Sequence, residues 1–331
     1  MTHASPLHVA AAVIRNPDGR VLLARRGVHQ EHGGLWEFPG GKLQPEEPAL
    51  QALARELHEE LGISIRQEAT LPLIEVTYPY PARVVQLQVF EVFAWSGEPH
   101  GREGQLIEWA DASTLRSRQF PAANLPVVSA ALLPRILLVT PEPDDEEAFF
   151  SGLRQSLLSG VKLVQFRAKS RSGDDFARLA SAAIACCRAH DARILLNGDP
   201  GLALEVGADG VHLSSAAVRN HAYRPVPADR LLSVACHSPQ ELAEARRVGA
   251  DLVLLGPVLA TETHPETPPL GWRLASAWRP LAGCPVYALG GQSVATLPEA
   301  VACGLQGSAG IRGFWAMGSP LPDPRLRVLV T

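Results

Sequence analysis

No apolar run in this 331-residue sequence is long enough for a membrane-spanning helix. The longest apolar stretches, such as residues 127–133, fall far short of the roughly 20 residues needed to cross a bilayer. Residues 1–12 lack a cationic start followed by a long apolar segment, so we expect no signal peptide. A formal net charge of −4 at pH 7 gives no general attraction for duplex nucleic acid or an anionic membrane. These absences predict a cytoplasmic protein that binds neither.

Cysteine is also scarce, with five residues in the chain and none among the first 130. The number is odd and no pair has the C-x-x-C spacing of a metal site, so we expect reduced, buried thiols. Hydrophobic residues, by contrast, make up 46% of the sequence and charged residues 19%. That composition excludes intrinsic disorder as the main state and is typical of soluble globular domains. Because one domain commonly takes about 100–200 residues, the length predicts two domains.

The sequence pattern changes near residue 133, which places the predicted domains at 1–133 and 134–331. The first segment mixes β-prone runs with one strong helix, as in an α+β domain. We expect its runs 8–14 and 20–24 to form a hairpin. The second segment alternates short apolar runs with helices, and glycine turns precede many of the runs. Its eight predicted strands are 136–139, 162–166, 193–196, 210–213, 231–235, 252–255, 286–288 and 308–311. Eight such units predict a (β/α)₈ barrel, with an open doubly wound sheet as the alternative.

Acidic residues gather on one face of the helix predicted for residues 48–63. Glu56, Glu59 and Glu60 stand at i, i+3 and i+4, within an arc of roughly 100°. Like charges at this spacing repel one another, and no lysine lies four residues away to offset them. Carboxylate oxygens so arranged suit Mg²⁺ or Mn²⁺, which also bind substrate phosphates. The residues alone leave two alternatives, a solvated acidic face and a metal site.

The surroundings of this helix resemble the Nudix box at each of its fixed positions. Gly41 is followed after five residues by Glu47, and after seven more by the run RELHEELGI at residues 55–63. The resemblance implies an α/β/α sandwich that hydrolyses a nucleoside diphosphate linked to another moiety. It implies that Glu56 activates the attacking water, with a carboxylate elsewhere as the alternative. It also implies that Arg55, with Glu47, holds a carboxylate in place. The implied ligands of Mg²⁺, with Mn²⁺ as the alternative, are Gly40, Glu56, Glu59, Glu60 and Glu103. The implied catalytic residues of this domain are Arg55, Glu56, Glu59 and Glu103.

Nearly all of the first 130 residues resemble the MutT-type diphosphatases of oxidised guanine nucleotides. The matching pieces are RR at 25–26, WEFPGGK at 36–42, GEP at 97–99, GREGQ at 101–105, EW at 108–109 and FPAAN at 120–124. The implied reaction converts 8-oxo-dGTP and water into 8-oxo-dGMP and pyrophosphate, which would cleanse the nucleotide pool for replication and repair of DNA. The implied substrate-binding residues are Arg26, Phe38, Lys42 and Asn124, with Asn124 at the base edge.

Three of these residues have simpler interpretations when each is taken alone. Asn124 also fits a helix cap, Phe38 an ordinary core residue, and Glu103 a charge on a surface loop.

Polar residues and glycines follow the predicted strands of the second segment, where barrel active sites lie. These motifs resemble the superfamily of thiamine-phosphate synthases and TenI-like thiazole tautomerases. The implied phosphate-binding residues are Gln165, Arg167, Lys169, Gly290, Gly291, Gly310 and Arg312. Gly198 and Ala217 stand where the synthases have two aspartates that hold Mg²⁺, and His264 replaces a loop lysine. These departures argue against the synthase step and favour a tautomerase with His237 as general acid and base.

Two further alternatives stay open at this point. The barrel would be degenerate if it merely bound a thiamine-pathway phosphate. Alternatively, the whole chain would serve the thiamine pathway, with the Nudix domain hydrolysing a thiamine or pyrimidine diphosphate analogue. A nucleotide-sensing scaffold without catalysis is the least favoured, since the Nudix box is intact.

Overall fold

The computed structural model describes residues 6–29, 31–262 and 266–321, and it divides into two compact units between Leu132 and Leu133. None of the helices within these ranges combines the length and apolar character that a membrane crossing requires. All five cysteines are free thiols. Cys187, Cys236 and Cys284 are buried as expected, while Cys186 and Cys303 are partly exposed.

The described part of the first domain contains nine strands, two α-helices and three 3₁₀ turns. The strands are β1 (Leu7–Ile14), β2 (Val21–Arg25), β3 (Trp36–Glu37), β4 (Gly40–Lys42), β5 (Ser64–Ile65), β6 (Thr70–Tyr80), β7 (Arg83–Val92), β8 (Trp95–Ser96) and β9 (Ile107–Ala110). The helices are α1 (Ala49–Leu61), α2 (Leu125–Leu132), η1 (Gln67–Ala69), η2 (Ala112–Ser117) and η3 (Ala122–Asn124). The strands form sheets of order β4-β1-β7-β6, β3-β2-β9 and β5-β8.

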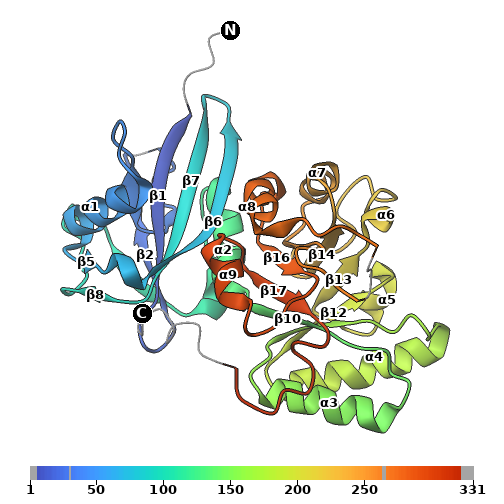
Figure 1. Cartoon of the computed structure of the whole chain (residues 1–331). Helices are drawn as coiled ribbons and strands as arrows, with labels where there is room; N and C mark the ends of the chain where they lie inside the picture. Colours follow the sequence, from blue (N-terminus) through green and yellow to red (C-terminus); the bar gives the residue numbers. More distant parts are fainter. Residues whose placement is uncertain (1–5, 30, 263–265, 322–331) are drawn as a thin grey trace. The chain divides into compact units, whose positions relative to one another are not determined.

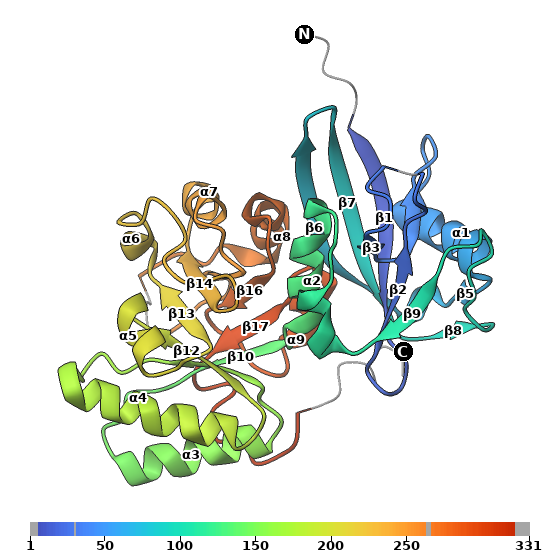
Figure 2. The same cartoon turned by 180° about the vertical axis from the view of Figure 1, so that it is seen from behind.

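Strand β1 is buried on both faces and separates two hydrophobic cores. Successive side chains of a strand point to opposite faces of the sheet. Accordingly Ala10 and Ala12 pack in the core that contains α1, whereas Ala11 and Val13 pack in the core that contains α2. The two helices lie on opposite sides of the strands (Figure 2). This layering confirms the α/β/α sandwich.

The prediction that residues 8–14 and 20–24 pair as a hairpin is wrong. The turn itself forms, with the Gly19 N–H donating to the Asn16 carbonyl at 2.9 Å. Beyond one isolated bridge between Arg15 and Val21, however, the two strands join different sheets. β1 pairs with β4 and β7, and β2 pairs with β3 and β9. Both strands are apolar on both faces, and full burial of such strands favours two sheets over a hairpin with one solvated face.

Helix α1 covers Ala49–Leu61, inside the range 48–63 in which the sequence predicts a helix. Pro48 is the N-cap residue with an extended backbone, and Gly62 ends the helix in the left-handed conformation at φ 72°. The buried face carries Ala52, Leu53, Leu57 and Leu61. The acidic residues therefore lie on the face that turns away from this core.

The second domain is a closed barrel of eight parallel strands with helices outside (Figure 1). The strands are β10 (Ile136–Val139), β11 (Leu163–Phe166), β12 (Arg193–Asn197), β13 (Gly210–Leu213), β14 (Leu231–Cys236), β15 (Leu252–Leu255), β16 (Val286–Leu289) and β17 (Gly307–Gly310). The helices are α3 (Glu146–Leu158), α4 (Gly173–Arg188), α5 (Pro200–Glu205), α6 (Ser215–Val218), α7 (Pro239–Arg247), α8 (Gly271–Ala282) and α9 (Leu297–Ala302). Closure between β10 and β17 confirms the barrel and rules out the open sheet.

Large side chains fill the interior of this barrel. Leu137, Leu163, Leu195 and Tyr287 belong to one buried cluster, as expected for a packed core rather than a pore. Tyr287 is fully buried, and its hydroxyl donates to the Pro134 carbonyl. The polar residues at the carboxyl ends of the strands therefore lie above a packed interior.

Candidate functional sites

A cavity of about 520 Å³ opens in the first domain beside β1 and α1. Its wall includes all four residues predicted to bind substrate, namely Arg26, Phe38, Lys42 and Asn124. It also includes three of the predicted metal ligands, namely Gly40, Glu56 and Glu60. Among the described residues, the lining does not include Glu59 or Glu103.

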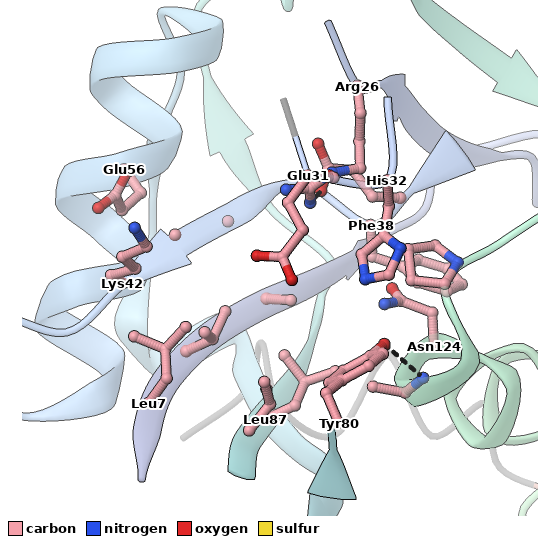
Figure 3. A pocket seen from close by; sticks show the side chains of 18 of the residues that line it. Leu7, Arg26, Glu31, His32, Phe38, Lys42, Glu56, Tyr80, Leu87 and Asn124 are labelled. Atoms are coloured by element: carbon pink, nitrogen blue, oxygen red, sulfur yellow. Dashed lines mark hydrogen bonds and ion pairs between the residues drawn. The ribbon is translucent and has the colours of Figure 1, made fainter. Parts of the chain in front are cut away.

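The cavity has two chemically different ends, which Figure 3 shows. Glu56 and Lys42 lie at the end near α1. Phe38, Tyr80 and Asn124 gather at the other end, together with the ring of His32. The end near α1 thus offers a carboxylate and an ammonium group, and the other end offers flat rings and one amide, with Arg26 and Glu31 beside them.

Arg55 ties the acidic residues of the Nudix box together. Its guanidinium donates two hydrogen bonds of 2.9 Å to Glu47, one of 2.8 Å to Glu56 and one of 3.3 Å to Glu59. The hydrogen bonds from Arg55 and from the Gln44 N–H lower the pKa of Glu47 to about 2. Such bidentate pairing fixes the direction of a carboxylate. The contacts are those that the resemblance implies for Arg55 and Glu47.

Glycine is required next to the Glu56 carboxylate. A Cβ atom on Gly41 would lie 2.1 Å from Cδ of Glu56, and one on Gly40, at φ 148°, would lie 2.1 Å from the Ala10 carbonyl oxygen. Any larger residue would push β4 or the carboxylate aside. The two glycines therefore let β4 lie close to both β1 and α1.

Several other carboxylates act electrostatically on Glu60. Burial raises the pKa of its carboxyl to about 8, and the charges of Glu56, Glu103 and Glu37 add to this shift. Glu103 itself lies on an exposed loop, and its backbone N–H donates to the side-chain oxygen of Gln105. Burial likewise raises the pKa of Glu37, against the opposing effect of its ion pair with Arg26. A cation among these carboxylates would relieve the repulsion.

The chemistry of these groups fits a divalent cation, although the side chains are not gathered around one point. Within residues 6–29, 31–262 and 266–321, no three His, Cys, Asp or Glu side chains converge closely enough to hold a metal ion. Glu59 is more than half exposed and turns toward Arg55. The carboxylates of Glu56, Glu59 and Glu60 are nevertheless hard oxygen donors, which Mg²⁺ and Mn²⁺ prefer.

The ring-lined end of the cavity is held by packing and one hydrogen bond. Phe38 is 3% exposed and stacks on Phe120 with ring centroids 5.5 Å apart. Phe38 is thus both a core residue and part of the pocket wall. The Tyr80 hydroxyl accepts a hydrogen bond of 3.2 Å from the Ala123 N–H, next to Asn124 (Figure 3). This bond joins the end of β6 to the segment that carries Asn124.

Replacing Tyr80 with phenylalanine should lower the free energy of unfolding by about 1 kcal/mol, because the partly buried Ala123 N–H loses its acceptor. Urea denaturation of the full chain measures this change. A Tyr78→Phe variant is the matched control, since Tyr78 packs against Tyr80 within the same strand. Equal stability of Tyr80→Phe and the unsubstituted protein would contradict a structural role for this bond.

In the second domain, the residues predicted to bind phosphate have different surroundings. Gln165 is 3% exposed, and its Oε1 atom has no hydrogen-bond partner. Arg167 pairs with Glu142 at 3.2 Å, and Arg312 pairs with Glu262. Gly290 and Gly291 have positive φ angles, and a Cβ on either would collide with the segment 257–260. Gly310 has an ordinary backbone conformation beside the Phe314 ring.

His237 follows β14 at the barrel mouth, and its imidazole orientation is fixed. Its Nδ1 atom lies 2.5 Å from the Gly256 carbonyl oxygen, which can only accept, so Nδ1 carries the proton. The Nε2 atom of the neutral ring is therefore a proton acceptor. The backbone N–H of His237 donates to Glu241, whose own N–H donates to Ser238 at the start of α7. This reciprocal capping holds the residue in place.

Other polar residues of the barrel have structural roles. Burial lowers the pKa of His212 to about 3, and its Nδ1 atom lies 2.8 Å from the Ser233 hydroxyl. Asp199, which follows Gly198, caps α5 by accepting from the Leu202 N–H at 2.8 Å. The Ala217 N–H donates to the hydroxyl of Ser214, the N-cap residue of α6. His264 lies outside the described residues.

The sequence alone does not predict several residues of these sites. Glu31, Glu37, His32, Tyr80 and Arg83 also line the cavity, and Glu142 and Glu241 contact the predicted barrel residues. Only two of them carry a local cue, since Glu37 lies inside the WEFPGGK match and Glu241 completes a capping box. The others reach their sites through the tertiary fold.

The chain matches two protein-family models. The model of the NUDIX domain matches residues 10–130, and the model of thiamine monophosphate synthase matches residues 136–314. An 8-oxo-dGTP diphosphatase from Escherichia coli (strain K12) is 37% identical over 123 residues, which cover 37% of this chain and 94% of that protein.

The second domain is similar to thiamine-phosphate synthases. A thiamine-phosphate synthase from Chlorobium phaeovibrioides (strain DSM 265 / 1930) is 31% identical over 198 residues, 58% of this chain and 90% of that protein. One from Parasynechococcus marenigrum (strain WH8102) is 38% identical over 190 residues, 56% of this chain and 52% of that protein. The chain therefore spans about half the length of the latter relative.

Fold and sites together define a two-domain protein in which a carboxylate helix borders a pocket and an (β/α)₈ barrel follows. The chain belongs to the Nudix family through its first domain and to the thiamine monophosphate synthase family through its second. The first domain is accordingly a hydrolase of phosphoric anhydride bonds.

Proposed function

We propose that the first domain hydrolyses 8-oxo-dGTP to 8-oxo-dGMP and pyrophosphate. The observation that carries this proposal is the two-ended cavity, with carboxylates and Lys42 at one end and rings and Asn124 at the other. A purine nucleotide has the same polarity, since a flat polar base is joined through a sugar to a polyphosphate. The similarity to a diphosphatase of this specificity supports the same substrate.

The base end discriminates by shape and hydrogen bonding. The Asn124 amide offers one donor and one acceptor, which matches a base edge that presents both. Phe38 and Tyr80 provide apolar and aromatic surface for the base. A substrate that leaves the amide unpaired loses binding free energy, because a polar group is then left without a partner.

The acidic end carries out the chemistry. The residues that would hold Mg²⁺ or Mn²⁺ are Glu56, Glu59 and Glu60, with the Gly40 carbonyl and Glu103, and the bound ion would neutralise the diphosphate. Glu56 accepts a proton from the attacking water, whose oxygen forms a bond to phosphorus as the bridging P–O bond breaks. Arg55 keeps the Glu56 carboxylate in position throughout. The nucleoside monophosphate and pyrophosphate then leave.

Replacing Asn124 with alanine should lower the preference for 8-oxo-dGTP over dGTP by about 10–100-fold, which is the effect of one lost hydrogen bond left without compensation. The ratio of kcat/KM for the two nucleotides, measured with the full chain, gives this preference. Asn220→Ala, at an exposed residue of the second domain, is the matched control.

The same assay with thiamine diphosphate separates this function from a role in the thiamine pathway. Preferential turnover of 8-oxo-dGTP supports the proposal. Equal turnover of dGTP and 8-oxo-dGTP, or faster turnover of thiamine diphosphate, would remove the substrate assignment.

We further propose that the second domain binds a thiazole phosphate and tautomerises it with His237. The specific observation is the imidazole whose Nδ1 proton is engaged by Gly256, which leaves Nε2 as the base. Gly198 and Ala217 offer no carboxylate for a metal, and Asp199 is engaged in capping α5. Proton transfer by an imidazole needs no metal, so His237 can serve a tautomerisation without those carboxylates. Calorimetric titration of the full chain with the thiazole phosphate tests the binding step.

A further inference from the structure

The loop after β11 surrounds a carboxylate from elsewhere in the barrel. Glu142 lies between β10 and α3, and its Oε1 atom is 3.2 Å from Nη1 of Arg167 and 3.2 Å from the Lys169 N–H. Its Oε2 atom accepts from the Ser170 N–H at 3.1 Å and from the Ser170 hydroxyl at 3.0 Å. Four donors on one loop therefore converge on a single side chain.

These donors form the kind of site that binds a phosphate. A guanidinium, the backbone N–H groups of two consecutive residues and a hydroxyl are typical partners of phosphate oxygens. The Glu142 side chain is 29% exposed and that of Arg167 is 22% exposed, so solvent reaches this site only in part. Burial alone would raise the pKa of Glu142, but the hydrogen bonds from Ser170 and Lys169 and the charge of Arg167 hold it below its ordinary value. The carboxylate is thus the anion of this site at neutral pH.

We propose that Glu142 is a built-in anion that occupies the donor loop at 167–170 and excludes a diphosphate from it. A carboxylate and a diphosphate cannot share four donors, because each needs the same hydrogen atoms and the two charges repel. The inference goes beyond the proposed function, since it assigns a role to a residue outside the Nudix pocket and away from His237. It adds a second physical argument, besides Gly198 and Ala217, against a synthase step in this barrel.

Removal of the charge should open the site. In a Glu142→Gln protein, pyrophosphate titrated without divalent metal should shift the backbone amide resonances of Lys169 and Ser170 saturably. We expect an affinity at least about tenfold higher than in the unsubstituted chain, since one charged hydrogen-bonded partner is lost as competitor. The double variant Glu142→Gln, Arg167→Ala should lose this gain. Reading two assigned amides keeps any binding by the Nudix pocket separate.

Glu146→Gln is the matched control. Its carboxylate, on α3, also pairs with an arginine, but with Arg178 of α4 at 2.6 and 3.0 Å rather than with Arg167. It should leave both amide titrations unchanged. Circular dichroism checks the folding of each variant, and Glu142→Ala removes the same charge if the amide variant does not fold.

Two results would overturn the proposal. One is saturable binding of pyrophosphate at Lys169 and Ser170 in the unsubstituted chain with the affinity of the variant. The other is a folded Glu142→Gln or Glu142→Ala protein that gains no binding at these amides. Because the proposal concerns only the barrel loop, either result leaves the assignments of the Nudix pocket and of His237 untouched.

Discussion

A Glu56→Gln protein should hydrolyse 8-oxo-dGTP about 10²–10⁴-fold more slowly than the unsubstituted chain, the usual contribution of a general base. The amide has the size of the carboxylate and its oxygen can still accept from Arg55, so the fold should persist. It cannot take a proton from water, and it contributes no charge to a metal site. Steady-state kcat with Mg²⁺ in excess measures the effect.

The control for this variant is Glu68→Gln, which makes the same chemical change at an exposed residue of η1. Binding of Mn²⁺ observed by electron paramagnetic resonance provides a second readout, and it should weaken only in Glu56→Gln. If Glu56→Gln kept full activity and Mn²⁺ affinity, the carboxylate helix would not be the catalytic element.

His237→Gln should slow conversion of a thiazole phosphate by a similar factor of about 10²–10⁴. Glutamine is able to donate to the Gly256 carbonyl, but it offers no nitrogen that takes up a proton near neutral pH. Turnover is followed by proton NMR of the thiazole ring. The variant should bind the phosphate as tightly as the unsubstituted chain, so that kcat falls while KM changes little.

His190→Gln is the matched control, because the His190 ring also lies against a backbone carbonyl, that of Cys186, at 2.9 Å. It stands after α4 rather than after a barrel strand, so turnover should be unaffected. Full turnover by His237→Gln would exclude this residue as the acid and base. Failure of the unsubstituted chain to bind any thiazole phosphate would remove the barrel function altogether.

The sequence predicts those parts of the fold that rest on local periodicity. Leucines at helical spacing and Gly62 locate α1, and short apolar runs after glycine turns locate all eight barrel strands to within one residue. Strand β6 is not foreseen, because Pro72 and Pro79 interrupt its pattern and a register shift occurs between Pro72 and Ile74. The false hairpin has the same origin, since a local turn does not determine which sheet a strand joins.

The candidate sites divide along the same line. The three glutamates and Arg55 lie on one helix, so their spacing alone places them on the same side of it. Arg26, Phe38 and Asn124 come from separate elements, and only the resemblance to a family joins them before the structure does. The Tyr80–Ala123 and Glu142–Arg167 contacts join residues 43 and 25 positions apart, and no periodicity encodes such pairs.

The alanines of β1 have a consequence for how this enzyme can diverge. Ala10 and Ala12 form the surface on which α1 rests, and both are fully buried. Since protein interiors are close-packed, a larger side chain there would lift the helix and shift its outer edge by a comparable amount. Substitutions at Ala10 and Ala12 are thus limited by the reaction on the other side of α1, because they would displace its acidic residues. Neither alanine itself contacts the nucleotide.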